Sequence, residues 1–304
     1  MSLSVNSVTG RRALQVALGM VWLLDGLLQF QPYMFTKAFV SQVIGGSAAG
    51  APVVVADPIT WSAGDLLHHT ALYNTLFASI QLSIGLGLLW PRTAKAALAA
   101  SIPWAIGVWW IGEGLGGLLS GTASTFTGAP GAAILYVFVA LLAWPHRESA
   151  DPGSSVATTG RLGGAAPRVI WAVLWVTLGY FALRPASGSP DGLAAMFAGM
   201  KAGEPQWIAA IDGALATTCA HLGIQVAVIV AVLSGIAAAT VALGRFSRLG
   251  VIAAAAIGAA IWLAEDFGAV FTGQGTDPNS GLLLLLVAAA FWPVAAQPRA
   301  ASLG

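Results

Sequence analysis

Residues 110–121 of the chain read WIGEGLGGLLSG, and residues 262–273 read WLAEDFGAVFTG. One Trp, one Glu and two Gly are identical between the segments, and most other positions hold similar residues. The segments lie 152 residues apart (262 − 110), and the same offset places His69 on His221. Self-similarity at a fixed offset is typical of a repeated structural unit. The sequence therefore predicts two copies of one unit.

Further matches flank this pair in the same order along the chain. At an offset of 153 residues, Trp22, Gly26 and Pro32 correspond to Trp175, Gly179 and Pro185. At an offset of 148, after a shorter loop, Pro130 and Trp144-Pro145 correspond to Pro278 and Trp292-Pro293. Small drifts of this kind are what insertions and deletions leave after a duplication.

The composition favours a chain that lies in a lipid bilayer. Hydrophobic residues make up 57% of the 304 residues, charged residues only 8%, and the mean hydropathy is +0.81. Soluble domains carry about 25% charged residues, and they cannot hide this much apolar surface. The net charge of +1 gives no reason to expect a nucleic-acid partner. With one cysteine, Cys219, the chain cannot form an internal disulfide, and we expect that residue to serve packing.

Apolar runs long enough to span a bilayer predict an all-α bundle of eight transmembrane helices. Their expected ranges are 13–30, 66–90, 96–119, 130–145, 169–184, 213–243, 249–271 and 280–296. The sixth run is too long for one span, and the first is expected to be a retained helix because no cleavage site follows it.

The positions of Lys and Arg predict the orientation, because cytoplasmic loops are enriched in both. They fall in alternate connections, with both termini on the same side: Arg11, Arg12, Arg92, Lys95, Arg147, Arg161, Arg168, Arg245, Arg248 and Arg299. The opposite connections hold only Lys37, Arg184 and Lys201. The sequence therefore predicts a multi-pass protein of a bacterial plasma membrane with both termini in the cytoplasm.

Residues 1–145 are the expected first repeat, 146–168 a cytoplasmic linker and 169–304 the second repeat. Because each repeat has an even number of spans, the two copies must share one orientation. Each repeat also has a long outer loop, 31–65 or 185–212. Each loop carries a Met-Phe pair and a later Trp, which predict a surface helix, a lid or a packing plug.

Ionisable residues within a membrane usually pair with each other or mark a functional site. Given the predicted topology, His69 and Glu113 lie at similar depth beneath the outer surface, and His221 and Glu265 repeat the arrangement. One interpretation is a structural His–Glu hydrogen bond in each repeat. The other is a functional site for proton transfer, a metal or a quinone.

The metal hypothesis combines His69, Glu113, His221 and Glu265, a ligand set that suits zinc, iron or copper. The quinone hypothesis uses a histidine to hydrogen-bond the ring carbonyl, beside Trp109, Trp110 or Phe77. Heme ligation by His69 and His221 is a further alternative. Gly112 and Gly116, which flank Glu113, form a GxxxG pair that predicts close helix packing.

The two copies differ at these positions, and the first is richer in polar groups. Asp25, Gln29 and His68 correspond to Leu178, Ala182 and Ala220, whereas Gly114 corresponds to Asp266. The candidate site of the first copy is therefore Asp25, Gln29, His68, His69 and Glu113, and the second copy offers His221, Glu265 and Asp266.

The four-span unit, with Trp22-x3-Gly26 and Trp175-x3-Gly179 in its first span, resembles the DoxX-like superfamily. The chain also resembles uncharacterised actinobacterial membrane proteins, through residues 28–35 and the Gly-Glu-Gly element around Glu113. The resemblance implies a membrane partner in a quinone- or thiol-linked redox pathway, and it assigns no catalytic residue.

Three classes of function remain open at this point. They are a redox-associated membrane subunit, a transporter of a small solute, metal or proton, and an assembly or scaffold protein without chemistry. The lipid bilayer is the expected environment in each. For a scaffold, the long outer loops would be the surface for a membrane or extracytoplasmic protein partner.

Overall fold

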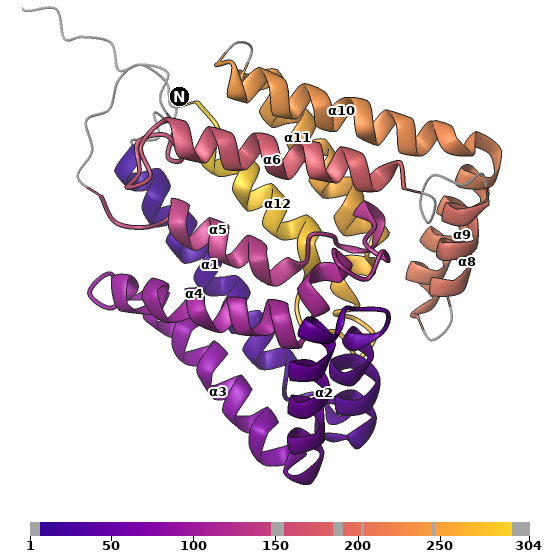
Figure 1. Cartoon of the computed structure of the whole chain (residues 1–304). Helices are drawn as coiled ribbons and strands as arrows, with labels where there is room; N and C mark the ends of the chain where they lie inside the picture. The colour runs from indigo at the N-terminus through magenta and orange to yellow at the C-terminus, as the bar shows by residue number, and fades with distance from the viewer. Residues whose placement is uncertain (1–6, 147–154, 185–190, 202–203, 245–246, 294–304) are drawn as a thin grey trace, which may run out of the picture.

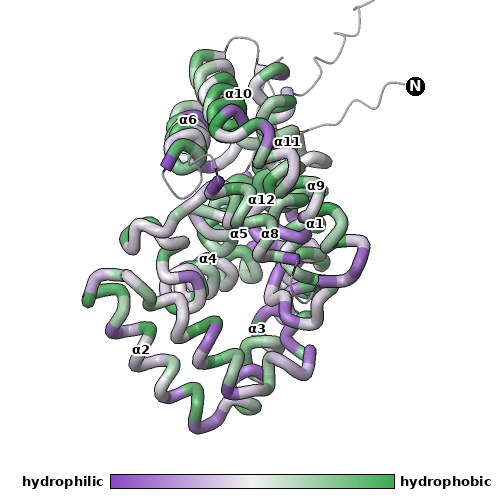
Figure 2. The backbone as a smooth tube through the Cα atoms, turned by 90° about the vertical axis from the view of Figure 1, so that its right-hand side faces the viewer, coloured by the Kyte–Doolittle hydropathy of each residue, from purple (hydrophilic) through white to green (hydrophobic). Residues whose placement is uncertain are grey.

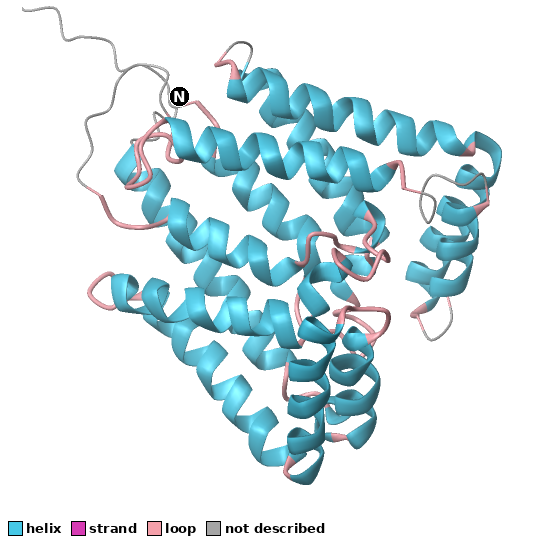
Figure 3. Ribbon diagram, viewed as in Figure 1, coloured by secondary structure: helices cyan, strands magenta, loops and turns pink. Residues whose placement is uncertain are grey.

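The computed structural model describes residues 7–146, 155–184, 191–201, 204–244 and 247–293. In this part of the chain every regular element is a helix and no strand occurs (Figure 3), which confirms the predicted all-α class.

The first half contains α1 (Ser7–Leu28), α2 (Val53–His68), α3 (Thr70–Leu89), α4 (Ala94–Ile111) and α5 (Ala132–Leu142). The second half contains α6 (Ala165–Ala182), α8 (Gly192–Met200), α9 (Gln206–Leu222), α10 (Ile224–Ala242), α11 (Ser247–Ala264) and α12 (Asn279–Ala290). Short turns join them: η1 (Pro32–Phe35), η2 (Phe39–Ile44), η3 (Gly45–Ala48), η4 (Gly114–Gly117), η5 (Thr125–Thr127) and η6 (Asp266–Gly268).

Five of the described helices, α3, α4, α6, α10 and α11, are long and apolar enough to cross a membrane. Their outward faces carry large aliphatic side chains, such as Val173, Val232 and Ile252, which are 60%, 56% and 53% exposed. Figure 2 shows α10 as almost continuously hydrophobic. Exposed apolar surface of this extent is unfavourable in water and favourable in lipid, so these helices fit a membrane protein.

Two of the predicted spans are each divided into two helices. The predicted span 66–90 begins inside α2, which ends at His68, and α3 starts at Thr70 because His69 has a non-helical backbone. The predicted span 213–243 is α9 followed by α10, separated by Gly223 with φ of 54°. A positive φ ends a right-handed helix, which explains why that apolar run was too long for one span.

The third and seventh predicted spans end early. Helix α4 stops at Ile111 rather than 119, and α11 stops at Ala264 rather than 271. In both places the chain turns into a left-handed conformation, described below. Helices α5 and α12 are correspondingly short, with 11 and 12 residues.

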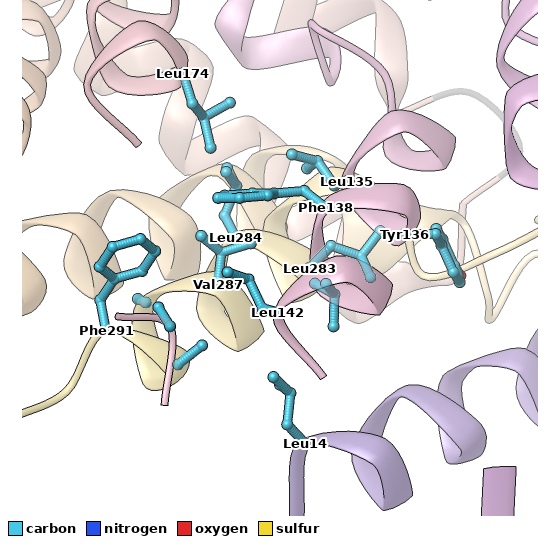
Figure 4. Close-up of a cluster of buried hydrophobic side chains, with 14 of the residues drawn as sticks. Leu14, Leu135, Tyr136, Phe138, Leu142, Leu174, Leu283, Leu284, Val287 and Phe291 are labelled. Carbon is cyan, nitrogen blue, oxygen red and sulfur yellow. The ribbon is translucent and has the colours of Figure 1, made fainter. Parts of the chain in front are cut away.

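The halves use the same neighbours within their bundles: α1 packs on α3 and α4 on α5, and α6 packs on α10 and α11 on α12. Helices α5 and α12 pack against each other between the halves (Figure 1). Figure 4 shows Leu135, Phe138 and Leu142 of α5 with Leu283, Leu284 and Val287 of α12 in one apolar cluster, and Tyr136 at its edge. A single core therefore joins both halves.

Arg11 and Arg12 stabilise the ends of two other helices. Arg11 donates hydrogen bonds to the carbonyl oxygens of Leu142 (2.6 Å) and Trp144 (3.3 Å), just where α5 ends. Arg12 donates to the carbonyl oxygens of Leu88 (2.8 Å) and Leu89 (2.5 Å) at the end of α3. Arginine at these positions satisfies carbonyls that have no partner within the helix. Of the residues used to predict orientation, Arg147, Arg245 and Arg299 lie outside the described residues.

The two long loops that the sequence predicts on the outer side contain helices at one end of the bundle. Figure 1 shows α2 and the α8–α9 pair at the right-hand end of the long helices. Met34 and Phe197 are buried, with exposed fractions of 0% and 2%, and each fills a small apolar cluster. The Met-Phe pairs therefore act as packing plugs, and Cys219 packs in the same cluster as Phe197. Pro185, one of the matched residues, lies outside the described part.

Candidate functional site

Four consecutive residues after each repeated glutamate have a left-handed backbone. Gly114 to Gly117 have φ of 55°, 58°, 63° and 70°, and Asp266 to Ala269 have φ of 50°, 57°, 78° and 53°. Left-handed geometry costs a non-glycine residue about 1–2 kcal/mol, so a run of it needs strong tertiary support. The turn reverses the chain directly after Glu113 and Glu265. Gly112 and Gly116 are thus not a helix-packing pair, because α4 ends before them.

The reversal brings each glutamate to the start of the next α-helix, α5 or α12. Glu113 Oε1 accepts a hydrogen bond from the backbone N–H of Ala133 in α5 at 2.9 Å. Glu265 accepts from the N–H of Gly281 (3.0 Å) and from Ser280 Oγ (2.6 Å) in α12. A carboxylate at a helix N-terminus satisfies free N–H groups and interacts favourably with the helix dipole. The repeated glutamates therefore share a structural task.

The histidines lie elsewhere. His68 and His69 lie at the α2–α3 junction and His221 near the α9–α10 junction, all with exposed side chains. No ion pair or hydrogen bond within the described residues joins His69 to Glu113 or His221 to Glu265. That part of the chain also contains no group of three or more His, Cys, Asp and Glu side chains arranged to hold a metal ion. The structure thus does not bring together the predicted His–Glu pairs, or the set His69, Glu113, His221 and Glu265.

A cavity of about 450 Å³ lies in the first half. Its walls come from α1, η2, α2, α3, α4 and α5, together with the loop that precedes α12. Three of the predicted site residues line it: Asp25, Gln29 and Glu113. The other predicted residues do not: His68, His69, His221, Glu265 and Asp266. Seven aromatic side chains share the walls: Trp22, Phe39, Trp61, Tyr73, Phe77, Trp104 and Tyr136.

One hydrogen bond organises the deep polar part of the cavity. Tyr136 donates from its hydroxyl to Asp25 Oδ2 at 2.6 Å, and its ring lies 4.4 Å from that of Trp22, centroid to centroid. Asn74, from α3, donates to the backbone carbonyl of Gln29 at 2.7 Å, at the end of α1. Helices α1, α3 and α5 are held together at this point by buried polar contacts.

Several buried oxygen atoms of cavity-lining residues have no hydrogen-bond partner in the described part of the chain. They are Asp25 Oδ1, Gln29 Oε1, Gln81 Oε1 and Glu113 Oε2. Their side chains are largely buried, with exposed fractions of 2%, 5% and 7% for Asp25, Gln29 and Gln81. Buried polar groups are almost always paired, and each exception calls for an explanation such as a bound molecule or water.

Asp277 also lines the cavity, and sequence reasoning missed it. It belongs to the loop before α12 in the second half, where it accepts hydrogen bonds from Thr276 Oγ1 and the Asn279 N–H, both at 2.8 Å. Gln31 reaches the same loop, donating to the carbonyl of Gly275 at 3.4 Å. Nothing in the repeat pattern indicates that this loop crosses into the other half. The only signal was its position just before Pro278, the partner of Pro130.

A loop of the first half likewise packs against the second half. Thr125 Oγ1 donates to the carbonyl of Leu178 in α6 at 2.5 Å, and Phe126 packs among Ala182, Phe197 and Ala264. The two loops thus cross reciprocally. In the second half a phenyl ring occupies the apolar cluster, whereas in the first half the crossing loop delivers a carboxylate to an open cavity.

Burial and neighbouring charge keep the acidic groups here easily protonated. Burial and, next, the negative charge of Asp277 together raise the pKa of Glu113 to about 8, while the hydrogen bond from the backbone N–H of Ala133 acts to lower it. Burial likewise raises the pKa of Asp277. Carboxyls with pKa values near neutrality can gain or lose a proton when a ligand changes their surroundings.

Four polar residues of the cavity lining are replaced at the corresponding positions of the second half. Asp25, Gln29, Gln81 and Tyr136 correspond, at the offsets 153, 152 and 148 given above, to Leu178, Ala182, Leu233 and Leu284. Each of these four polar residues is matched by an apolar one, whereas Glu113 is matched by Glu265. Asp266 lies instead beside Asp212, and burial together with that neighbour raises its pKa, but neither lines the cavity.

Comparison with known proteins adds no relative to this picture: no protein family, curated protein or solved structure matches the chain.

Proposed function

We propose that the chain is an eight-span protein of a bacterial plasma membrane, built from repeats at 1–145 and 169–304 that are joined by the linker 146–168. The shared left-handed turns and the two glutamate caps support this duplication. Arg11 and Arg12, which cap helices at one end of the bundle, support cytoplasmic termini. A DoxX-like relationship remains part of this proposal.

The proposed activity is binding of a small, largely apolar molecule in the first-half cavity, near the extracytoplasmic face. The observation that carries it is the 450 Å³ cavity whose lining residues hold unpaired buried oxygens. Ligand sites are typically apolar hollows with a few polar groups that fix orientation. Asp25, Gln29, Glu113 and Asp277 are the proposed polar contacts, and the aromatic rings surround the apolar body.

Gly107 offers a direct test, because a side chain added there meets no atom within 4 Å and the residue lines the cavity. Gly107→Leu is expected to fill the cavity and abolish binding of phenylbutanol, measured by tryptophan fluorescence of purified protein. Gly235→Leu, on the open face of α10, is the matched control and should bind like the wild type. Equal binding by all three proteins would remove the cavity from the proposal.

A redox role with a bound quinone is a narrower form of the same proposal. The aromatic walls support it, although the predicted histidine donors lie outside the lining. Absorption and mass spectra of a solvent extract from purified protein decide this point. A quinone present in wild type and missing from Gly107→Leu would support the redox role.

The orientation has its own test in a Cys219→Ser background. Thr60→Cys lies on α2 at the proposed outer end, and Arg92→Cys lies in the connection between α3 and α4, both exposed. A membrane-impermeant maleimide applied to intact cells is expected to label Thr60→Cys and to leave Arg92→Cys unlabelled. The reverse pattern would invert the proposed topology.

A further inference from the structure

Among the described residues, the charged groups that line the cavity are all acidic. They are Asp25, Asp65, Glu113 and Asp277, and this part of the chain adds no Lys, Arg or His to the lining. Buried carboxylates normally pair with a cation or a hydrogen-bond donor, because an unpaired buried charge is costly. The protein supplies Tyr136 to Asp25 and Tyr73 to Asp65, the latter at 2.5 Å, and backbone N–H groups to Glu113 and Asp277. The described part of the chain supplies no positively charged side chain to the lining.

The aromatic lining points to the same kind of ligand. The faces of Trp, Tyr and Phe attract cations, most strongly where water is excluded, and quaternary or protonated amines are often held by several rings. Trp22, Trp104 and Tyr136 lie around the deep part, and Phe77 packs on Trp104 with ring centroids 5.5 Å apart. Trp61 and Asp65 lie on α2 at the exposed side.

The unpaired atoms set the direction of the hydrogen bonds. Among the fully buried polar atoms of the described lining residues, those without a partner are one oxygen each of Asp25, Gln29, Gln81 and Glu113 and the indole N–H groups of Trp22 and Trp104. A ligand that donates hydrogen bonds or carries positive charge satisfies more of them than one that accepts. An anion would meet four carboxyls and no cation.

We propose that the ligand of this cavity is an organic cation, a protonated or quaternary amine on an apolar body, held between Asp25, Glu113 and Asp277 and the surrounding rings. This inference rests on the proposed ligand-binding function and narrows it to one chemical class. In the second half, the residues that match Asp25 and Tyr136 are Leu178 and Leu284, so only the first half offers this site.

Binding of such a cation is coupled to release of a proton. The titratable groups that interact with Glu113 in the described part of the chain are Asp277, Glu265 and Tyr136, and none of them is basic. With its pKa near 8, Glu113 is mostly protonated at pH 7 in the empty site. When the cation binds, the carboxyl O–H bond breaks, the proton leaves to solvent, and the carboxylate pairs with the ligand.

The test compares three ligands that share one apolar body: phenylbutylamine (cation), phenylbutanol (neutral) and phenylbutyrate (anion). Calorimetry on full-length protein in a non-ionic detergent is expected to show the amine binding about tenfold or more tighter than the alcohol, with the acid weakest. Titrations in buffers of different ionisation enthalpy should show release of up to about one proton with the amine only.

Variants separate the two levels of the proposal. Asp25→Asn with Glu113→Gln should bring amine and alcohol to similar affinities, whereas Asp212→Asn, a buried acid outside the cavity, should keep the wild-type preference. If amine and alcohol bind wild type equally, the cation assignment fails and ligand binding stands. If none of the three binds, both proposals fail. Phenylbutyrate as the tightest ligand would reverse the assignment.

Discussion

The Gly116→Ala variant is expected to yield little folded protein, because both the backbone conformation and a close neighbour exclude a side chain at this position. Its φ is 63°, and an added Cβ would overlap the carbonyl group of Pro130. The left-handed conformation alone costs alanine about 1 kcal/mol, and overlap with a fixed backbone adds a few kcal/mol more. Since membrane domains tolerate only modest losses, we expect a sharp fall in monodisperse protein and in Tm.

Gly121→Ala separates these two costs. Gly121 also has a left-handed φ, of 79°, but nothing lies within 4 Å of the position of a Cβ. This variant should lose only about 1 kcal/mol. Gly268→Ala, which meets the carbonyl of Asp277 in the second half, should behave like Gly116→Ala. Thermal unfolding followed by size-exclusion chromatography measures all three. A Gly116→Ala protein as stable as Gly121→Ala would show that the turn is not fixed as described.

Stability is expected to fall as pH rises from about 5 to about 8. Burial raises the pKa of Glu265 to about 8, against the hydrogen bonds from Ser280 and Gly281, and Glu113 behaves alike. The folded state therefore holds protons that the unfolded chain releases above its ordinary glutamate pKa, near 4.5. Each group contributes stability that is complete below that value and is lost as pH rises through the folded-state pKa, at about 1.4 kcal/mol per pH unit.

The measurement is Tm in detergent across this pH range. Glu265→Gln, which resembles the protonated side chain, should flatten part of the slope, and adding Glu113→Gln should flatten more. If the dependence of Tm on pH is unchanged in the double variant, other titratable groups cause it. Ligand-free protein is required here, since an amine bound at Glu113 would lower the pKa of that carboxyl.

The sequence was most informative about helix content and about where polar residues accumulate. Apolar runs predict the long helices well, because their composition is set by the lipid they face. Their ends were predicted less well at Ile111, His69 and Gly223, where single backbone angles decide the boundary. The asymmetry between Asp25 and Leu178 directed attention to the first half, whose cavity Asp25, Gln29 and Glu113 line.

The pairing of His69 with Glu113 was inferred from depth alone. Similar depth does not fix the direction in which side chains point, and the left-handed turn carries Glu113 to the start of α5 rather than toward α2. Asp277 could not be found from the repeat, because its role depends on a loop passing from one half to the other. Contacts of that kind leave no periodic trace in a single sequence.

The crossing of that loop ties the charge of the cavity to the relative placement of the halves. Three of the acids belong to the same half as the rings, whereas Asp277 is carried by the segment leading into α12. Any tilt of one bundle against the other would change the distance from Asp277 to Glu113, and therefore the affinity for a positively charged ligand. Ligand binding and the angle between the bundles would then be coupled, and a gated carrier or a membrane-embedded sensor requires such coupling.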